Sequence, residues 1–506
     1  MSQTAADIEH LDVIIVGAGI SGIGAAYYLQ RDHPTKSYAI LEARADTGGT
    51  WDLFRYPGIR SDSDLFTFGY EFKPWHGDAI ASADKILAYL RDTATENGID
   101  AKVRSQHKVR AAHWSSAAAR WVVDVERTDT GERLQLAARW LFVATGYYRY
   151  DEGFTPHFEG RERFQGQVVH PQHWPEDLDY TGKKVVVIGS GATAVTLVPA
   201  MASSAAHVTM LQRSPTYIVP LPAKDSVATT LMRLLGESRG FGLARRKNIA
   251  QLRNTYRFCR RFPRLSRRIL RHLNAAQLPK GYPVDVHFNP SYEPWDQRLC
   301  VVPDADLFRA ISAGDASVVT DRITRFTENG IELESGQHLE ADIIVTATGL
   351  NLVMQGGISL TVDGEPVHLA DRIAFKGMML SGVPNYAFAL GYFNVPWTLR
   401  VGLVCQHFCR LLAEMDKLGH DICCPNLHDH DLGMDTRPLM DFAAGYLQRA
   451  ADHMPRQGFK RPWVLPPDYH DDAAMLQTDA VRDPNLTFSR SSTPPARQPA
   501  DVTATA

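Results

Sequence analysis

Cysteine and long apolar runs are scarce in this sequence of 506 residues. Its six cysteines are spaced for neither a disulfide framework nor a zinc site, so we expect buried free thiols and no bound metal. No run approaches the roughly 18 apolar residues of a membrane span, and the start of the chain has no secretory signal. We therefore expect a cytoplasmic protein.

An excess of charge of one sign is also lacking. The formal net charge is −3, which argues against a nucleic-acid-binding protein as a whole. Hydrophobic residues make up 44% of the chain and charged residues 22%, as in ordinary globular proteins. A chain of this length is too long for one core and predicts two or three domains.

Two glycine-rich loops are present, each between an apolar run and a predicted helix. In such loops the first glycine permits a tight turn, the second lets the backbone approach a pyrophosphate, and the third position lets helix and strand pack closely. The helix N-terminus then attracts the anion. A glycine turn without a ligand is the alternative. The residues expected to bind cofactor are Gly17, Gly19, Ser21 and Gly22 in the first loop, and Gly189, Ser190, Gly191, Ala192, Thr193 and Ala194 in the second.

The residue that ends the following strand differs between the two loops. Glu42 ends the strand after the first loop, and a carboxylate there accepts hydrogen bonds from a ribose diol. Gln212, Arg213 and Ser214 end the strand after the second loop, and an arginine there suits a 2′-phosphate. The chain is therefore predicted to bind two different dinucleotides, one FAD-like or NAD-like and one NADP.

These units predict an α/β fold with two nested dinucleotide-binding (Rossmann-like) domains. We expect residues 1–150 to form the first part of the first domain and residues 351–475 its second part. Residues 181–350 are expected to form the second domain. Residues 151–180 are expected to be a linker, and residues 476–506 a disordered tail.

A basic insertion is expected at residues 225–290 of the second domain. No acidic residue lies between Arg245 and Arg271, a stretch that holds many arginines and interleaved apolar residues. This pattern predicts amphipathic helices. A solvated helical face over the cleft is the favoured interpretation, and attachment to anionic lipid through residues 245–271 is the alternative.

Two further motifs resemble signatures of a known family. The run from Phe164 to Pro175 is similar to the Phe-x-Gly-x3-His-x3-Trp-Pro fingerprint of type I Baeyer–Villiger monooxygenases, within the flavin-containing monooxygenase superfamily. A second family signature comprises Gly49-Thr50-Trp51, Tyr56-Pro57-Gly58 and Asp62. The resemblance covers roughly residues 10–465. The runs 295–300 and 376–382 are most similar to the ethionamide-activating branch.

The resemblance implies FAD in the first domain, NADPH in the second and O2 as oxidant. In this family NADPH reduces the flavin, the reduced flavin captures O2 as a C4a-peroxyflavin, and the peroxide attacks a ketone to give an ester or a lactone. The flavin performs the chemistry and the protein orients it. The implied partners are therefore O2 and a small-molecule ketone or thioether. Neither the oligomeric state nor the identity of the substrate follows from the sequence.

Arg298 matches the family arginine that stabilises the negatively charged peroxide and its adduct, and Asp62 matches the carboxylate beside it. A fixed cation in a site that excludes water suits this task, and a guanidinium stays charged at any working pH. The alternatives are a structural ion pair of Arg298 with Asp296 or another acid, and a helix N-cap role for Asp62.

Other site residues follow from the resemblance alone. Gln297 stands where many family members have a lysine that helps bind the 2′-phosphate, so the phosphate would depend on Arg213. His170 and Trp174 suit a hinge or packing role. Further FAD contacts are expected at Gly49, Thr50, Trp51, Asp62 and Val109, and substrate contacts at Asn394 and Trp397.

The sequence bears on three functions other than ketone oxygenation. Oxygenation of sulfur or nitrogen, on thioethers or thioamides, is the alternative within the oxygenases. A flavin disulfide reductase needs a redox dithiol, and the first domain has no Cys-x-x-Cys. A nucleotide-sensing module without catalysis would leave Arg298 and Asp62 without a role.

Overall fold

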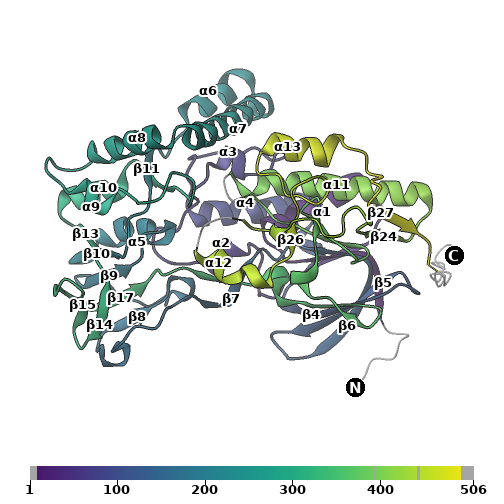
Figure 1. The fold of residues 1–506 in the computed structure, drawn as a ribbon, viewed down its shortest axis with the longest axis horizontal. Helices are drawn as coiled ribbons and strands as arrows, with labels where there is room; N and C mark the ends of the chain where they lie inside the picture. The colour runs from purple at the N-terminus through teal and green to yellow at the C-terminus, as the bar shows by residue number, and fades with distance from the viewer. Residues whose placement is uncertain (1–7, 393–394, 442–444, 492–506) are drawn as a thin grey trace, which may run out of the picture.

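Two sheets with parallel cores organise the computed structural model, which describes residues 8–392, 395–441 and 445–491 (Figure 1). The larger sheet has the order β20-β19-β4-β5-β6-β1-β2-β3, and β23 also pairs with β6. Its strands are β1 (Glu9–Val16), β2 (Tyr38–Leu41), β3 (Val103–Arg104), β4 (His107–Ser115), β5 (Arg120–Arg127), β6 (Arg133–Val143), β19 (Ser359–Val362), β20 (Glu365–Pro366) and β23 (Tyr386–Phe388).

The centre of the larger sheet is buried on both faces. Strands β1 and β2 are parallel, as are β1 and β6, and all four residues of β2 are buried. A parallel sheet covered on both faces needs near-continuous apolar strands, which is the pattern of Val13–Val16. Helix α1 (Ile20–Asp32) follows β1 and packs against the long helix α11 (Trp397–Leu418). The first glycine loop therefore lies at the carboxyl edge of this sheet.

The smaller sheet has the order β13-β10-β9-β17-β8, with all its pairs parallel. Its strands are β8 (Gln167–Val169), β9 (Lys184–Ile188), β10 (His207–Gln212), β13 (Ala316–Thr320) and β17 (Ile343–Thr346), and helix α5 (Ala192–Ala202) follows the second glycine loop. The edge strand β8 corrects one expectation, because it lies in the segment 151–180 that was predicted to be a linker. Its apolar Val168 and Val169 pair with β17 instead.

The insertion is helical, as predicted. Helices α6 (Ser226–Leu235), α7 (Glu237–Arg261) and α8 (Pro263–Ala275) form a layer along one edge of the molecule, at the top of the view in Figure 1. Strand β11 (Ile218–Leu221), just before the insertion, pairs with β12 (Cys300–Pro303) just after it. This pairing closes the base of the insertion and fixes the position of the segment 294–299.

The last part of the chain returns to the larger sheet, through β19, β20, β23 and α11. The prediction of a disordered tail from residue 476 was wrong for its first part. Strand β27 (Leu486–Ser489) pairs antiparallel with β24 (Ile422–Pro425), and Leu486 is buried there. The apolar Leu476 is also fully buried, so core contacts override the polar composition of this segment. Residues 492–506 lie outside the described ranges.

The remaining elements complete the two domains. Of the helices in the described ranges, none combines the length and the apolar character that crossing a bilayer would need. The remaining helices and strands are α2 (Thr50–Leu53), α3 (Leu65–Phe68), α4 (Ala83–Glu96), α9 (Val284–His287), α10 (Asp306–Ala313), α12 (Gly445–Ala450), α13 (Tyr469–Ala473), β7 (Tyr148–Gly153), β14 (Ile323–Thr327), β15 (Gly330–Leu333), β16 (His338–Glu340), β18 (Leu350–Leu352), β21 (Ala374–Phe375), β22 (Met379–Leu380), β25 (Arg437–Pro438) and β26 (Arg456–Gln457).

Candidate active site

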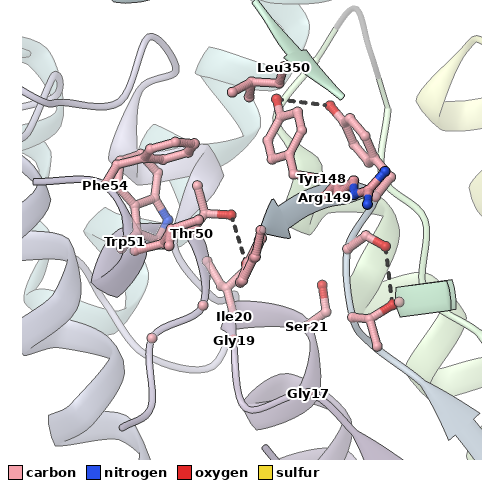
Figure 2. A pocket seen from close by; sticks show the side chains of 18 of the residues that line it. Gly17, Gly19, Ile20, Ser21, Thr50, Trp51, Phe54, Tyr148, Arg149 and Leu350 are labelled. Atoms are coloured by element: carbon pink, nitrogen blue, oxygen red, sulfur yellow. Dashed lines mark hydrogen bonds between the residues drawn. The ribbon is translucent and has the colours of Figure 1, made fainter. Parts of the chain in front are cut away.

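A cavity of about 830 Å³ lies between the two sheets and is lined by both domains. The first glycine loop forms one end of it, with Trp51 and Phe54 on one side and Arg149 on the other (Figure 2). The second domain contributes residues of α5 and of the segment before β12, among them Arg298. A ligand in this cavity would therefore contact both dinucleotide-binding units.

The first loop fits a pyrophosphate because it carries almost no side chains. Gly17 has a φ of +101°, and a Cβ built there would lie 2.8 Å from the carbonyl oxygen of Ala144. A Cβ on Gly22 would lie 1.8 Å from the carbonyl oxygen of Gly17. The helix N-cap is Gly19, so no side chain caps the first turn of α1. The free N–H groups of that turn are thus available to an anion.

Glu42 follows β2 directly and lines the cavity, as its predicted role as a ribose contact would require. The side chain is buried, and burial raises the pKa of its carboxyl. The backbone N–H groups of Ala18 and Arg44 oppose this rise by donating to the two carboxylate oxygens, at 2.7 and 3.0 Å. These bonds hold the carboxylate against the glycine loop.

The remaining residues predicted for the first cofactor also line the cavity, namely Gly49, Thr50, Trp51, Asp62 and Val109. The Trp51 ring packs edge-to-face on Phe68, with the ring centroids 5.7 Å apart. The hydroxyl oxygens of Thr50 and Tyr150 lie 3.5 Å apart across the cavity. Trp51 is thus both a packing residue and part of the wall.

The second loop has the same backbone constraint but contributes less to the cavity. Gly189 has a φ of +137°, and a Cβ there would lie 2.3 Å from the carbonyl oxygen of Ala347. Of its predicted contacts, Ala192 and Thr193 line the cavity, whereas Gly189, Ser190, Gly191 and Ala194 are not among its lining residues. Gly191 is the N-cap of α5 and supplies no capping side chain, so this helix also presents free N–H groups.

One positively charged side chain, that of Arg213, is accessible at the end of β10, the strand after the second loop. Arg213 and Ser214 are exposed, and the backbone N–H of Gly189 donates to Leu211, two residues before Arg213. Gln212 does not fit the predicted role of a free donor to phosphate. Its side chain is buried, and its amide nitrogen donates to the carbonyl of His287 and to the hydroxyl of Thr320, at 2.9 and 2.8 Å.

Arg298 and Asp62 come together in the cavity, although they are 236 positions apart in the chain. A guanidinium nitrogen lies 3.9 Å from a carboxylate oxygen. Asp62 raises the pKa of Arg298 above its ordinary value, against the opposing effect of burial. The Arg298 side chain remains 39% exposed, and it lines the cavity, so its charge is available to a bound molecule.

Neighbouring residues fill the purely structural roles that the sequence also allowed for Arg298 and Asp62. Asp296 pairs with Arg260 of the insertion, with 2.6 Å between nitrogen and oxygen, rather than with Arg298. The N-cap of α3 is Asp64, whose carboxylate accepts from the backbone N–H of Thr67 at 3.1 Å. Asp62 is therefore not the cap of this helix and faces the arginine instead.

This division of roles predicts unequal stability effects at two neighbouring carboxylates. Replacing Asp64 with alanine removes the α3 cap and is expected to lower the free energy of unfolding by about 1–2 kcal/mol. Replacing Asp62 with asparagine is expected to change it by less than about 1 kcal/mol, because the Arg298 pair is partly exposed. Denaturant unfolding of the two variants measures the difference. Equal losses would show that Asp62 is mainly a structural residue.

Three tyrosines around Arg298 were not identified from the sequence. Tyr147 and Tyr148 follow the Ala-Thr-Gly turn after β6, and their hydroxyl oxygens lie 3.3 Å apart. Tyr446 comes from α12, and all three influence the pKa of Arg298. Burial raises the pKa of each phenol, so all three stay neutral. The pair after the glycine turn was a usable signal, whereas Tyr446 arrives only through the tertiary fold.

Of the predicted substrate contacts, Trp397 is described and Asn394 lies outside the described residues. Trp397 begins α11 and lines the cavity. Its indole N–H donates to the hydroxyl of Ser21 in the first glycine loop, at 2.9 Å. Its ring centroid lies 5.3 Å from that of Tyr147. The returning segment therefore meets the first loop at the cavity wall.

The Tyr-Pro-Gly signature joins the two domains. Gly58 has a φ of +72°, and a Cβ there would lie 2.6 Å from the Cβ of Ala200 in α5. Arg60 pairs with Asp306 at the start of α10, with 2.5 Å between the charged atoms. The Nε2 of His170 in the fingerprint donates to the carbonyl oxygen of Gly349 at 3.1 Å, and its Nδ1 accepts from the backbone N–H of Gln172 at 3.2 Å. Both signatures thus lie where the domains meet.

The chain matches one protein-family model and several similar proteins. The model for pyridine nucleotide-disulphide oxidoreductases matches residues 14–220, a range without a cysteine. The FAD-containing monooxygenase EthA of Mycobacterium tuberculosis is 52% identical over 488 residues, which cover 96% of this chain and 99% of that protein. EthA of Mycolicibacterium smegmatis is 51% identical over 484 residues, with 95% and 98% covered.

Solved structures show the same fold at lower sequence identity. An oxidized steroid monooxygenase bound to NADP aligns with a TM-score of 0.75 and 21% identity, covering 95% of this chain and all of that chain. A cyclohexanone monooxygenase from Rhodococcus sp. Phi1, bound to NADP+, aligns with a TM-score of 0.71 and 18% identity, covering 96% and 100%.

Proposed function

Because the chain belongs to the FAD-containing monooxygenases, we propose that it uses NADPH and O2 to insert one oxygen atom next to a ketone carbonyl, giving an ester or a lactone. Its resemblance to type I Baeyer–Villiger monooxygenases agrees with this membership. The observation that carries the proposal is the pair of Arg298 and Asp62, which faces the cavity between the two dinucleotide-binding units.

Each cofactor has residues suited to it. The glycine loop at Gly17 and the Glu42 carboxylate would hold the pyrophosphate and ribose of FAD in the first domain, formed by residues 1–150 and 351–475. The loop at Gly189 and Arg213 would hold NADPH in the second domain, residues 181–350. When bound, FAD accepts a hydride from NADPH and activates O2.

Arg298 would stabilise negative charge that develops on oxygen during the transfer. Its guanidinium is charged at every working pH and is already fixed beside the cavity, so little reorganisation is needed when the charge appears. Asp62 would orient this side chain. The neutral tyrosines 147, 148 and 446 add polar groups around the cation without competing with its charge.

The substrate would enter beside the first glycine loop. Trp397 offers an apolar ring there and is held by its bond to Ser21, so it would shape the space in which the ketone lies. Because the same cavity would also hold FAD, only part of its volume of about 830 Å³ is left for the substrate, which suits a small molecule rather than a polymer.

Product analysis with two substrates tests the reaction type. The purified protein, loaded with FAD, is incubated with NADPH and O2 and either a methyl ketone or a thioether, and the products are identified by mass. We expect an ester from the ketone, and some sulfoxide from the thioether as a side reaction. Sulfoxide without any ester would favour oxygenation of sulfur or nitrogen. NADPH consumption that yields only hydrogen peroxide with both substrates would contradict oxygenation.

A further inference from the structure

An apolar stripe is exposed along helix α8. Phe262, just before the helix, and Leu265, Ile269 and Leu273 within it have 48, 47, 42 and 40% of their surface exposed. They recur at intervals of three and four residues and therefore share one face. A different face, with Leu270, is buried against the protein. The exposed stripe is thus not needed for packing of the helix in the described chain.

Cations that lack protein partners lie beside this stripe. Several basic residues of the insertion are engaged: Arg245 donates to three backbone carbonyls, Arg253 and Arg257 pair with Asp468, and Arg271 pairs with Asp285. Within the described ranges, no ion pair or hydrogen bond of the side chain is found for Arg264 or Arg268, and both are exposed. Free positive charge of the insertion therefore lies on α8, as well as on α6 and α7, where Arg233, Arg239 and Arg246 are also exposed.

The same surface continues onto α7. Phe258 is 39% exposed, and its ring centroid lies 5.5 Å from that of Phe262. The Arg261 guanidinium lies 5.7 Å from the centre of the Phe262 ring. We call this surface the basic apolar face; it comprises Phe258, Arg261, Phe262, Arg264, Leu265, Arg268, Ile269 and Leu273. It lies on the helical layer at one edge of the molecule (Figure 1).

We propose that the basic apolar face docks on an anionic membrane surface. Aromatic and aliphatic side chains on one side of a helix enter the boundary between headgroups and acyl chains, while adjacent arginines contact anionic headgroups. Each cation near such a surface contributes about 1 kcal/mol. A second copy of this chain is disfavoured as the occupant, because it would bring the same uncompensated arginines together.

The position of this face also relates to the cavity. The buried side of α7 carries Ile249, which packs with Tyr392, and Tyr392 lines the cavity. The helical layer would therefore lie between the bilayer and the wall of the cavity. Docking would keep that wall close to the pool of apolar molecules dissolved in the membrane.

Sedimentation with lipid vesicles tests the docking. The full-length protein is mixed with vesicles of phosphatidylglycerol and phosphatidylcholine, or of phosphatidylcholine alone, and the bound fraction is measured at low and high salt. We expect binding only to the anionic vesicles, and weaker binding as salt screens the charges. The double variant R264E/R268E should bind at least about tenfold more weakly, and L265S/I269S should also lose binding.

A matched variant separates the face from the net charge. R133E/R161E makes the same change in charge at two exposed arginines, one at the start of β6 and one shortly before β8, and should bind as the unaltered protein does. Both strands lie away from α8 in Figure 1. All variants are first compared by circular dichroism and thermal midpoint. Absence of binding to anionic vesicles by the unaltered protein would overturn the proposal. So would equal binding to both vesicle types, or a dimer in solution that R264E/R268E dissociates.

Discussion

Replacing Arg298 with alanine is expected to reduce ester formation by about a hundred- to a thousandfold, the usual effect of removing one preorganised group that stabilises developing charge. Reduction of the flavin by NADPH should continue, because the glycine loops, Glu42 and Arg213 are unaffected. Consumption of NADPH should then become uncoupled from product and yield hydrogen peroxide. The three quantities are measured as ester by mass, flavin absorbance under anaerobic conditions, and peroxide.

Three matched variants sharpen this prediction. Arg298→Lys keeps a positive charge but loses the planar fork, so an intermediate loss of ester is expected. Asp62→Asn keeps the cation but removes its orienting partner, and should lose less ester than Arg298→Ala. Arg325→Ala removes an exposed arginine that pairs with Glu332 on the small antiparallel sheet, and should change none of the three quantities. Unchanged ester formation in Arg298→Ala would remove this residue from the reaction.

Replacing Arg213 with alanine is expected to reduce the preference for NADPH over NADH by about ten- to a hundredfold. A hydrogen bond to a charged group contributes about 1.5–3 kcal/mol, and Arg213 is the exposed cation at the strand end where the 2′-phosphate would lie. Gln212 cannot substitute, because its amide is committed to His287 and Thr320. Steady-state kinetics with both cofactors give the ratio of kcat/KM values.

The cofactor that lacks the phosphate is the internal control for this second prediction. The kcat/KM for NADH should stay nearly constant in Arg213→Ala, because NADH has no group for the arginine to bind. Gln297→Lys should raise the preference for NADPH, since it places a cation where the family resemblance implies a lysine that helps bind the 2′-phosphate. A preference that is unchanged in Arg213→Ala would place the 2′-phosphate elsewhere.

Much of the fold could be predicted because local sequence patterns encode it. Both strand–loop–helix units are identified by an apolar run that ends in a glycine, Gly17 or Gly189. At each of these glycines a Cβ would clash with a backbone carbonyl. The helical insertion was likewise visible in its amphipathic pattern. Strand β8 and strand β27 were missed, because each is a short segment that becomes a strand only through its partner, β17 or β24. Such pairings depend on contacts distant in sequence.

The site was predicted unevenly for the same reason. The pairing of Arg298 with Asp62 followed from motifs, and their distance in the structure agrees with that expectation. Local spacing could not show that Asp296 is taken by Arg260, or that Asp64 rather than Asp62 caps α3. Tyr446 reaches Arg298 only because the returning segment folds back over the cavity. Tyr446 was therefore missed because it belongs to no motif and reaches the site only through the tertiary fold.

The fate of the oxygen atom tests the central claim most directly. The FAD-loaded protein is given NADPH, a methyl ketone and O2 enriched in the heavy oxygen isotope, and the product is examined by mass spectrometry. Insertion next to the carbonyl predicts an ester that carries a single heavy oxygen atom, in the bridging position. Recovery of unchanged ketone together with labelled hydrogen peroxide, at full NADPH consumption, would contradict the account.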